Sequence, residues 1–416
     1  MSWIRSRGTL DRLLVGRANS FGLLRLLLAL SVVYAHAYVL GYGSDRGWKP
    51  LWALSVSPVD CSTLAVAGFF VLSGFMITSS GTRLSSARFA WHRALRILPG
   101  LWASLLVTAL VVAPLVHIRL FGSTAGFWSS RSGPLAYLKG SWITAMSSGF
   151  DISGVMSAAT HRGLVHNPAF EGTLWSLSYE IFCYVVVGIL AAGGVLKRAP
   201  RTVLLITVGL WSSMLVNFVD APARASEARE PSAAVAVPLL GGLETHFLVY
   251  LGFCFMLGAT MRLFQHRIHI NGLLALGAAA VLLVTMHYGG FLVFGYPAFA
   301  YLLFYLGVRL PSWLHWVGRK HDYSYGAYIY GFLAEQLLTL YGVPKHGMAV
   351  YLSLSVAGTL ALAFLSWHLV ERQALRLKDW TPPRPSALRR GPRPESSGGD
   401  GQPVLPGQGV LEGQRL

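Results

Sequence analysis

The sequence predicts an all-α polytopic integral membrane protein with about ten transmembrane helices. Of its 416 residues, 54% are hydrophobic and only 12% are charged, whereas soluble domains carry roughly 25% charged residues. Apolar stretches of about twenty residues, the length that crosses a bilayer, recur along most of the chain. The expected spans are about 21–40, 64–80, 97–116, 173–193, 203–219, 242–261, 272–288, 291–308, 323–341 and 348–370.

The distribution of basic residues predicts the orientation of these spans. If the N-terminus is cytoplasmic, about three quarters of the 34 Lys and Arg residues fall on the inner side of the membrane. Both termini are therefore expected in the cytoplasm. The net charge of +17 is explained by this topology signal and by attraction to anionic membrane lipid, so no nucleic-acid partner is expected. Three scattered cysteines are too few for a disulfide framework or a metal cluster, and no metal is expected.

The chain is expected to have three parts. Residues 1–20 form a basic cytoplasmic segment without the features of a cleaved signal peptide. Residues 21–378 form the transmembrane domain, and residues 379–416 are a Pro-, Gly- and Ser-rich tail that is expected to be disordered.

The outer loop 117–172 is too long for a simple connection and is a candidate binding element. Within it, 136–150 is apolar enough for an extra span. Insertion of that stretch would place the basic residues at 197–201 outside and invert every later span. We therefore expect an interfacial or re-entrant helix there. Selectivity is expected to depend on the aromatic and histidine residues of this loop, namely Trp128, Trp142, His161 and His166.

The first span carries two ionisable residues, Arg25 and His36. Eleven residues correspond to roughly 16 Å and to three helical turns plus about 20°, so both side chains leave the same face. Arg25 is expected near the cytoplasmic boundary and His36 in the outer half. Arg25 could simply extend to the interface, and His36 could simply bond a neighbouring helix. Ionisable residues inside a membrane are nevertheless functional candidates by default.

Two further arginines, Arg93 and Arg96, precede the third span. A spacing of three places them on one helical face. Paired guanidinium groups at a membrane boundary suit phosphate, because the planar fork binds oxyanions in a bidentate way. The positive-inside signal explains the same residues equally well.

The fourth span contains Glu180, seven residues from its outer end at Thr173. That corresponds to a depth of roughly 10 Å, comparable to the expected depth of His36. If the two side chains face each other, a carboxylate at this depth could pair with His36, orient its imidazole ring and stabilise the cationic form. Other ionisable residues share the outward bias and suggest a polar cavity that opens outward: Glu244, His246, His287 and Glu335.

The order of motifs resembles acyltransferase family 3, the polytopic acyltransferases that include bacterial O-antigen and exopolysaccharide O-acetylases. The resemblance covers about 19–378. It is carried by the spacing of Arg25 and His36, AVAGFFVLSGFMI at 65–77, the Arg93 and Arg96 pair, LWSLSYE at 174–180, DYSYGAYIYGFLAEQ at 322–336 and SWHLVERQALRLK at 366–378.

The resemblance implies a cytoplasmic acyl-CoA donor, with acetyl-CoA expected, and a glycan or lipid-linked glycan acceptor beyond a bacterial inner membrane. It makes His36 the catalytic base or acyl carrier, assisted by Glu180. It assigns Arg25, Arg93 and Arg96 to the phosphates of CoA. Substrate contacts are expected from three residues around the fourth span, namely Trp175, Tyr179 and Glu171.

Two positions depart from the family pattern. Gln373 stands where the family usually has proline, which concerns only a helix end. The family frequently has a histidine or other polar residue where Gly331 and Phe332 stand here, so the acceptor class stays open. The alternatives are a transporter or flippase of a lipid-linked sugar and acylation of a non-glycan small molecule. Against a transporter, the sequence shows no repeated halves. A homo-oligomer is compatible with the sequence.

Overall fold

The computed structural model describes residues 8–14, 16, 18–43, 60–143, 150–220 and 233–380. The chain divides into two compact units, Met1–Lys378 and Asp379–Leu416. Almost all of the second unit, and with it the expected disorder of the tail, lies outside the described residues. The following paragraphs concern the first unit.

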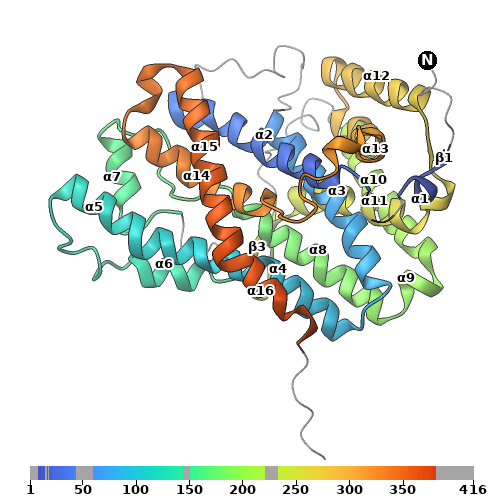
Figure 1. The fold of residues 1–416 in the computed structure, drawn as a ribbon, viewed down its shortest axis with the longest axis horizontal. Coiled ribbons are helices and arrows are strands. Elements are labelled where there is room, and N and C mark those ends of the chain that lie inside the picture. The colour runs from blue at the N-terminus through green and yellow to red at the C-terminus, as the bar shows by residue number, and fades with distance from the viewer. Residues whose placement is uncertain are drawn as a thin grey trace, which may run out of the picture. The chain divides into compact units, whose positions relative to one another are not determined.

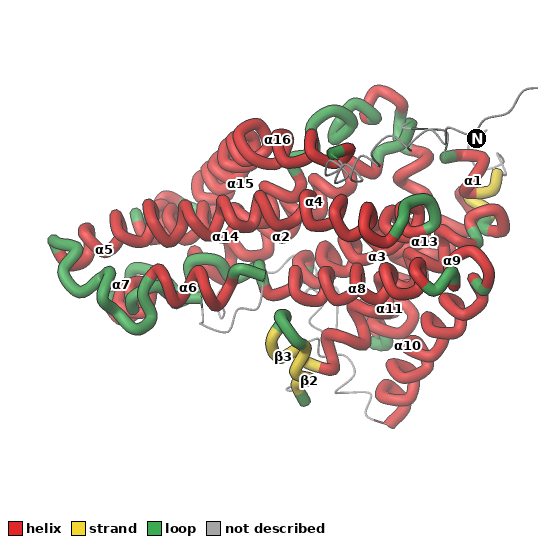
Figure 2. Tube along the Cα trace, turned by 90° about the horizontal axis from the view of Figure 1, so that it is seen from below, coloured by secondary structure: helices red, strands yellow, loops and turns green. Residues whose placement is uncertain are grey.

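Helices account for about three quarters of the described residues, and strands for very few (Figures 1 and 2). The α-helices are α1 (Leu10–Leu13), α2 (Phe21–Tyr42), α3 (Cys61–Gly81), α4 (Ser86–Val107), α5 (Ala113–Phe121), α6 (Pro134–Ser141), α7 (Val155–His161), α8 (Trp175–Ala192), α9 (Val195–Arg198), α10 (Pro200–Asp220), α11 (Thr245–Leu263), α12 (Gly272–Tyr288), α13 (Tyr296–Arg309), α14 (Ser324–Leu340), α15 (Met348–Ser366) and α16 (Arg372–Leu375). Three π-helical stretches continue or precede them: η3 (Thr108–Val112), η5 (Phe291–Gly295) and η8 (Trp367–Glu371). Short 3₁₀ turns are η4 (Gln265–Arg267), η6 (Ser312–Leu314), η7 (Val343–His346) and η9 (Arg376–Asp379).

The described strands form two small antiparallel pairs. One pairs β1 (Gly8–Thr9) with β4 (His269–Ile270), and the other pairs β2 (Ala234–Val237) with β3 (Gly241–Glu244). The first ties the segment before α2 to the turn after α11. The second forms a hairpin directly before α11 (Figure 2).

Every expected span falls on a helix. Eight helical segments are long and apolar enough to cross a membrane, and α12 is a shorter apolar helix of 17 residues. The helix α14, also of 17 residues, coincides with the ninth expected span. The prediction of an all-α polytopic membrane protein is confirmed, while the count of ten and the side of the termini stay predictions. In the stretch 136–150, α6 ends at Ser141 and residues 144–149 lie outside the described ranges.

Large apolar side chains cover the outer faces of several helices. On α10, Leu205 and Val219 are 69% and 67% exposed, and Leu276 on α12 is 68% exposed. Such continuous apolar surfaces are unfavourable in water but suit the hydrocarbon of a bilayer. The exposed faces of α10 and α12 therefore support their assignment to the membrane.

Two helix contacts hold the centre of the unit together. The helices α3 and α11 cross where Gly74 and Gly258 each lie against the partner backbone, so that a Cβ on either would overlap a carbonyl oxygen. The helices α2, α14 and α15 pack side by side in a second close group (Figure 1). Small residues permit such approach, which is how helices associate when lipid surrounds them.

Candidate functional site

One end of the helical unit gathers most of the arginines discussed above, and we call it the basic end. It comprises the start of α2, the end of α3, the start of α4 and the segment 310–323 before α14. The distribution of charge in the sequence predicts that this end faces the cytoplasm.

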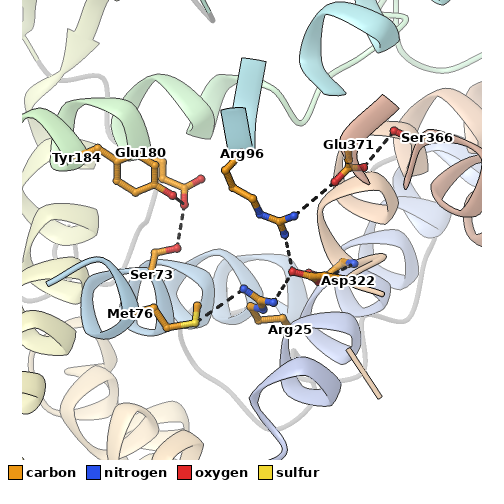
Figure 3. Close-up of polar contacts among 10 residues, drawn as sticks. Arg25, Ser73, Met76, Arg96, Glu180, Tyr184, Asp322, Ser366 and Glu371 are labelled. Atoms are coloured by element: carbon orange, nitrogen blue, oxygen red, sulfur yellow. Dashed lines mark hydrogen bonds and ion pairs between the residues drawn. The ribbon is translucent and has the colours of Figure 1, made fainter. Parts of the chain in front are cut away.

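Asp322 joins two of the predicted arginines (Figure 3). Its Oδ2 atom accepts from Arg25 on α2 and from Arg96 on α4. The other oxygen, Oδ1, accepts from the Ser324 hydroxyl at 2.6 Å. Arg96 also reaches Glu371 at 3.5 Å between Nη1 and Oε2, and Ser366 donates to that carboxylate at 3.1 Å. One chain of charges therefore links α2, α4, the segment before α14 and the stretch η8.

The electrostatics of Asp322 follow from this geometry. Burial alone would raise the pKa of its carboxyl group, but Arg25 and Arg96 outweigh that effect and hold the pKa at about 2. Asp322 is therefore ionised throughout the physiological range. The two guanidinium groups expected to bind donor phosphates are already partly neutralised by a carboxylate of the same chain.

A pocket of about 570 Å³ opens beside Arg25. Its volume lies within the usual range for small-molecule sites. The charged and polar residues that line it are Asn19, Arg25, Ser79, Arg83, Arg262, His315 and Arg319. None of the described residues that line it is acidic, and the walls also include the rings of Phe21 and Phe75. The pocket thus combines positive charge with an apolar wall, as a phosphate-bearing organic anion requires.

The backbone around Gly318 closes one side of this pocket. Gly318 has φ +71°, and a Cβ there would lie 2.6 Å from the Cα atom of Gly22. Only glycine adopts this conformation without strain and also permits such a close approach. The segment before α14 is thereby held against the first turn of α2, which brings His315 and Arg319 into the same pocket wall as Arg25.

Arg93 lies apart from the pocket. It is within electrostatic range of Tyr184 and Glu180 on α8. Its Nε atom is buried and has no hydrogen-bond partner in the described part of the chain. Of the three predicted donor arginines, only Arg25 lines the pocket, and Arg96 is connected to it through Asp322.

His36 lies far along α2 from the basic end. Its imidazole ring packs edge-on against Phe332 of α14, with ring centroids 5.4 Å apart and an interplanar angle of 80°. The Phe332 ring also approaches Gly172, where a Cβ would lie 2.6 Å from the ring. The His36 side chain on α2 therefore packs against Phe332 of α14, and Phe332 in turn packs against the segment that precedes α8.

Glu180 does not accept a hydrogen bond from His36. Its Oε1 atom accepts from Ser73 of α3 at 2.8 Å and from Tyr184 of α8 (Figure 3). Ser73 is three residues from Met76, whose Sδ atom lies 3.9 Å from Nη1 of Arg25. Along the helices, Glu180 is therefore roughly 5 Å from the level of Arg25, whereas His36 is roughly 16 Å from it. The expected depth of Glu180 was in error because α8 is displaced along its axis relative to α2.

The three expected substrate residues do not form one surface. Trp175 and Tyr179 pack with Phe247 at centroid distances of 4.7 and 5.8 Å, next to the β2–β3 hairpin. Glu171 is fully buried and accepts from Ser104 at 2.7 Å, from Thr108 at 2.6 Å and from Tyr137 at 3.3 Å.

The contacts of Glu171 fix the end of the long outer loop. Burial raises the pKa of its carboxyl group, and the three hydroxyl donors counteract that effect. Thr108 begins the π-helical stretch η3, which re-aims side chains along the continuous helix from Ser86 to Phe121. The geometry therefore supports a role for Glu171 in anchoring the loop 162–174 to α4.

Comparison with known proteins identifies the family of this chain. Residues 19–368 match the family described as acyltransferase domain. The chain belongs to this acyltransferase family. It is 28% identical over 368 residues to the O-acetyl transferase of Shigella phage Sf6, which covers 86% of this chain and 96% of that protein. It is also 28% identical over 381 residues to Nodulation protein 10 of Rhizobium leguminosarum bv. viciae, covering 87% and 95%. No solved structure matches the chain.

As a member of the acyltransferase family, the protein is a multi-pass membrane enzyme. Its candidate site also contains two acidic residues that the sequence did not single out. Asp322 and Glu371 stand within the motifs 322–336 and 366–378, yet neither was assigned a role. In the sequence, each is only a single carboxylate beside an apolar segment. The structure shows their importance, because Arg25 and Arg96 both pair with Asp322, and Arg96 also reaches Glu371.

The aromatic residues of the outer loop remain exposed in this acyltransferase. Trp128 and Trp142 are 54% and 51% exposed. His166 lies beside Gly43 at the end of α2, where a Cβ would be 3.5 Å from its Nδ1 atom. His161 instead uses its Nδ1 atom on the carbonyl oxygen of Ser157 within α7.

Proposed function

We propose that this acyltransferase moves an acetyl group from cytoplasmic acetyl-CoA to a hydroxyl group of a glycan on the far side of a bacterial inner membrane. The observation that supports this best is the polarity of α2. One end of this helix contributes Arg25 to a basic pocket without a described acidic wall, and the other end carries His36. Donor recognition and proton transfer would thus be joined by a single helix.

The basic pocket suits the donor. CoA carries several phosphates, and Arg25, Arg83, Arg262 and Arg319 present guanidinium groups around one volume. The Nε atom of Arg25 is buried without a hydrogen-bond partner among the described residues, so Arg25 retains donor capacity beyond Asp322. Arg93 and Arg96 would add positive charge along the path from this pocket into the membrane.

The acceptor assignment extends the name of a relative. The Shigella phage protein is named an O-acetyl transferase, which supports a hydroxyl acceptor here. A glycan or lipid-linked glycan fits the exposed tryptophans of the outer loop, because aromatic rings stack on sugar faces. Membrane lipid would surround the apolar helix faces, and a homo-oligomer is compatible with them.

The chemistry requires a base for the acceptor hydroxyl. His36 would take that proton while the acceptor oxygen bonds to the acyl carbon and the carbon–sulfur bond of the thioester breaks. In a variant of this mechanism, His36 itself carries the acyl group between donor and acceptor. Both variants place the same residue at the centre of the reaction.

The test uses membrane vesicles from a strain that makes the protein, with labelled acetyl-CoA as donor and total surface glycan as acceptor. His36→Ala should abolish transfer while the protein stays inserted and folded. The double variant Arg83→Gln and Arg319→Gln should raise the apparent KM for acetyl-CoA about tenfold or more, since it removes two charge-assisted contacts. Retained transfer in His36→Ala would contradict the proposed function, and mass spectrometry of the glycans should show the loss of their acetyl groups.

A further inference from the structure

A carboxyl group without a described partner lies in the half of the molecule that contains His36. Glu335 of α14 is 0% exposed, and neither of its oxygens has a hydrogen-bond partner among the described residues. Buried polar groups are nearly always satisfied, and an isolated charge is costly to bury. A lone carboxyl group inside a membrane helix therefore points to a functional role.

The packing of α14 against α15 fixes what faces Glu335. Near one end of this contact, the hydroxyl groups of Thr339 and Tyr351 lie 2.9 Å apart. Near the other end, a Cβ on Gly331 would lie 3.7 Å from the methyl group of Thr359. The two helices are antiparallel, and these two contacts lie eight residues apart on each of them. Glu335 and Ser355 stand midway between the contacts, so they lie opposite each other. Ser355 is also 0% exposed, and its hydroxyl group has no partner in the described ranges.

The packing of α14 against α2 shows which part of α2 lies level with Glu335. A Cβ on Gly331 would lie 2.8 Å from Val33, and a Cβ on Gly41 would lie 2.7 Å from the Tyr351 ring, which bonds Thr339. Eight residues separate the two contacts on each helix, so α2 and α14 run parallel in register.

Midway between these two contacts, Glu335 is level with Ala37 of α2. Ala37 is fully buried and directly follows His36. Phe332, which touches the His36 ring, shares a helical face with Glu335 because it stands three residues before it. The carboxyl group of Glu335 and the imidazole of His36 therefore lie within about one helical turn of each other along the axis.

Other ionisable groups near this level are already engaged. The Tyr351 hydroxyl bonds Thr339 and the carbonyl oxygen of Glu335 itself. Glu171, which directly precedes Gly172, is held by three hydroxyl donors. Glu180 bonds Ser73 and Tyr184 toward the basic end. Among the described carboxyl groups, Glu335 therefore lies near the level of His36 and has both oxygens without a hydrogen bond.

We propose that Glu335 is the positioning residue for His36, the carboxyl group that stabilises the imidazolium ring formed when His36 takes the acceptor proton. This inference rests on the function proposed above. In that step the acceptor oxygen bonds to the acyl carbon, the carbon–sulfur bond breaks, and the hydroxyl proton moves to His36. The leaving thiolate of CoA then takes this proton, so that His36 and Glu335 return to their starting states. Because Glu335 is fully buried, its carboxylate near the cation would stabilise that cation more than a carboxylate in solvent would.

The decisive variant is Glu335→Gln, which keeps the size and hydrogen-bonding capacity of the side chain but cannot carry negative charge. In the vesicle assay with labelled acetyl-CoA, its maximal rate should fall about a hundredfold while the apparent KM for acetyl-CoA stays within about twofold. Glu335→Asp should restore part of the rate. The matched control is Thr339→Val, one turn along the same helix interface, which should lower the thermal midpoint in detergent and leave the maximal rate unchanged.

A purely structural role would give the opposite pattern. In that case Glu335→Gln would retain the maximal rate of the wild type, and the proposal would be overturned. The parallel measurement on His36→Ala separates this failure from that of the proposed function. An active His36→Ala protein would reject the function itself, whereas an inactive His36→Ala beside a fully active Glu335→Gln would reject only the role of Glu335.

Discussion

Asp322 shows how one residue changes the meaning of others. Arg25 and Arg96 are unexplained cations when read along the sequence, and each becomes half of an ion pair in the structure. Removing one partner of a buried pair is more costly than its net contribution suggests, because the remaining charges stay buried and unpaired. Asp322 therefore controls both the geometry of Arg25 in the pocket and the cohesion of α2, α4 and α14.

Substitution Asp322→Asn should reveal both roles. A carboxyl group with a depressed pKa stabilises the folded state above its unfolded pKa of about 4, and this contribution disappears as the pH falls toward about 2. The wild type should therefore exceed Asp322→Asn in stability by about 2 kcal/mol near pH 7. The difference should shrink between about pH 4 and pH 2, as measured by denaturant unfolding in detergent. A difference that does not depend on pH in this range would show that the lost contact is not an ion pair.

At the scale of elements, the crossing of α3 and α11 rests on two glycines. Gly74 and Gly258 lie against the carbonyl oxygens of Phe255 and Val71, so neither position has room for a Cβ. Gly258→Ala should force the helices apart and cost about 1–3 kcal/mol, measured as a lower unfolding midpoint. Gly277→Ala on α12 is the matched control, because nothing lies within 4 Å of a Cβ there. It should leave stability unchanged or slightly raise it, since alanine favours helix.

The helices could be predicted from sequence, whereas the contacts between them could not. Length and apolar composition are local properties, so the span expected at 21–40 corresponds to α2 within two residues at its far end. The depth of Glu180 depends on how far α8 slides against α2 and α3, which no local pattern encodes. Glu335 was noted only as one of several outward ionisable residues, and its place beside the level of His36 emerged from the registers of α2, α14 and α15.

At the scale of the whole molecule, vectorial transfer requires the basic pocket and the long outer loop to face opposite sides of the membrane. Five expected spans separate the loop at 117–172 from the segment 310–323, and an odd number places them on opposite sides. Whether the two segments face opposite sides depends on α12. Its 17 residues make it the shortest of these five segments, because η5 and α13 form one continuous helix of 19 residues. If α12 did not cross, both segments would lie on one side and no acyl group would need to traverse the membrane.

Cysteine labelling in intact cells decides between these arrangements. In a background with Cys61→Ser, which removes the described cysteine that is not buried, the exposed positions Ser129 and Ser312 are replaced singly by cysteine. A membrane-impermeant maleimide should label Ser129→Cys in intact cells and Ser312→Cys only after the membrane is permeabilised. Labelling of both from outside would contradict the ten-span topology and the cytoplasmic donor site together. Labelling of Ser312→Cys alone would invert the molecule and move the basic pocket away from cytoplasmic acetyl-CoA, because the positive-inside rule would then have failed for this chain.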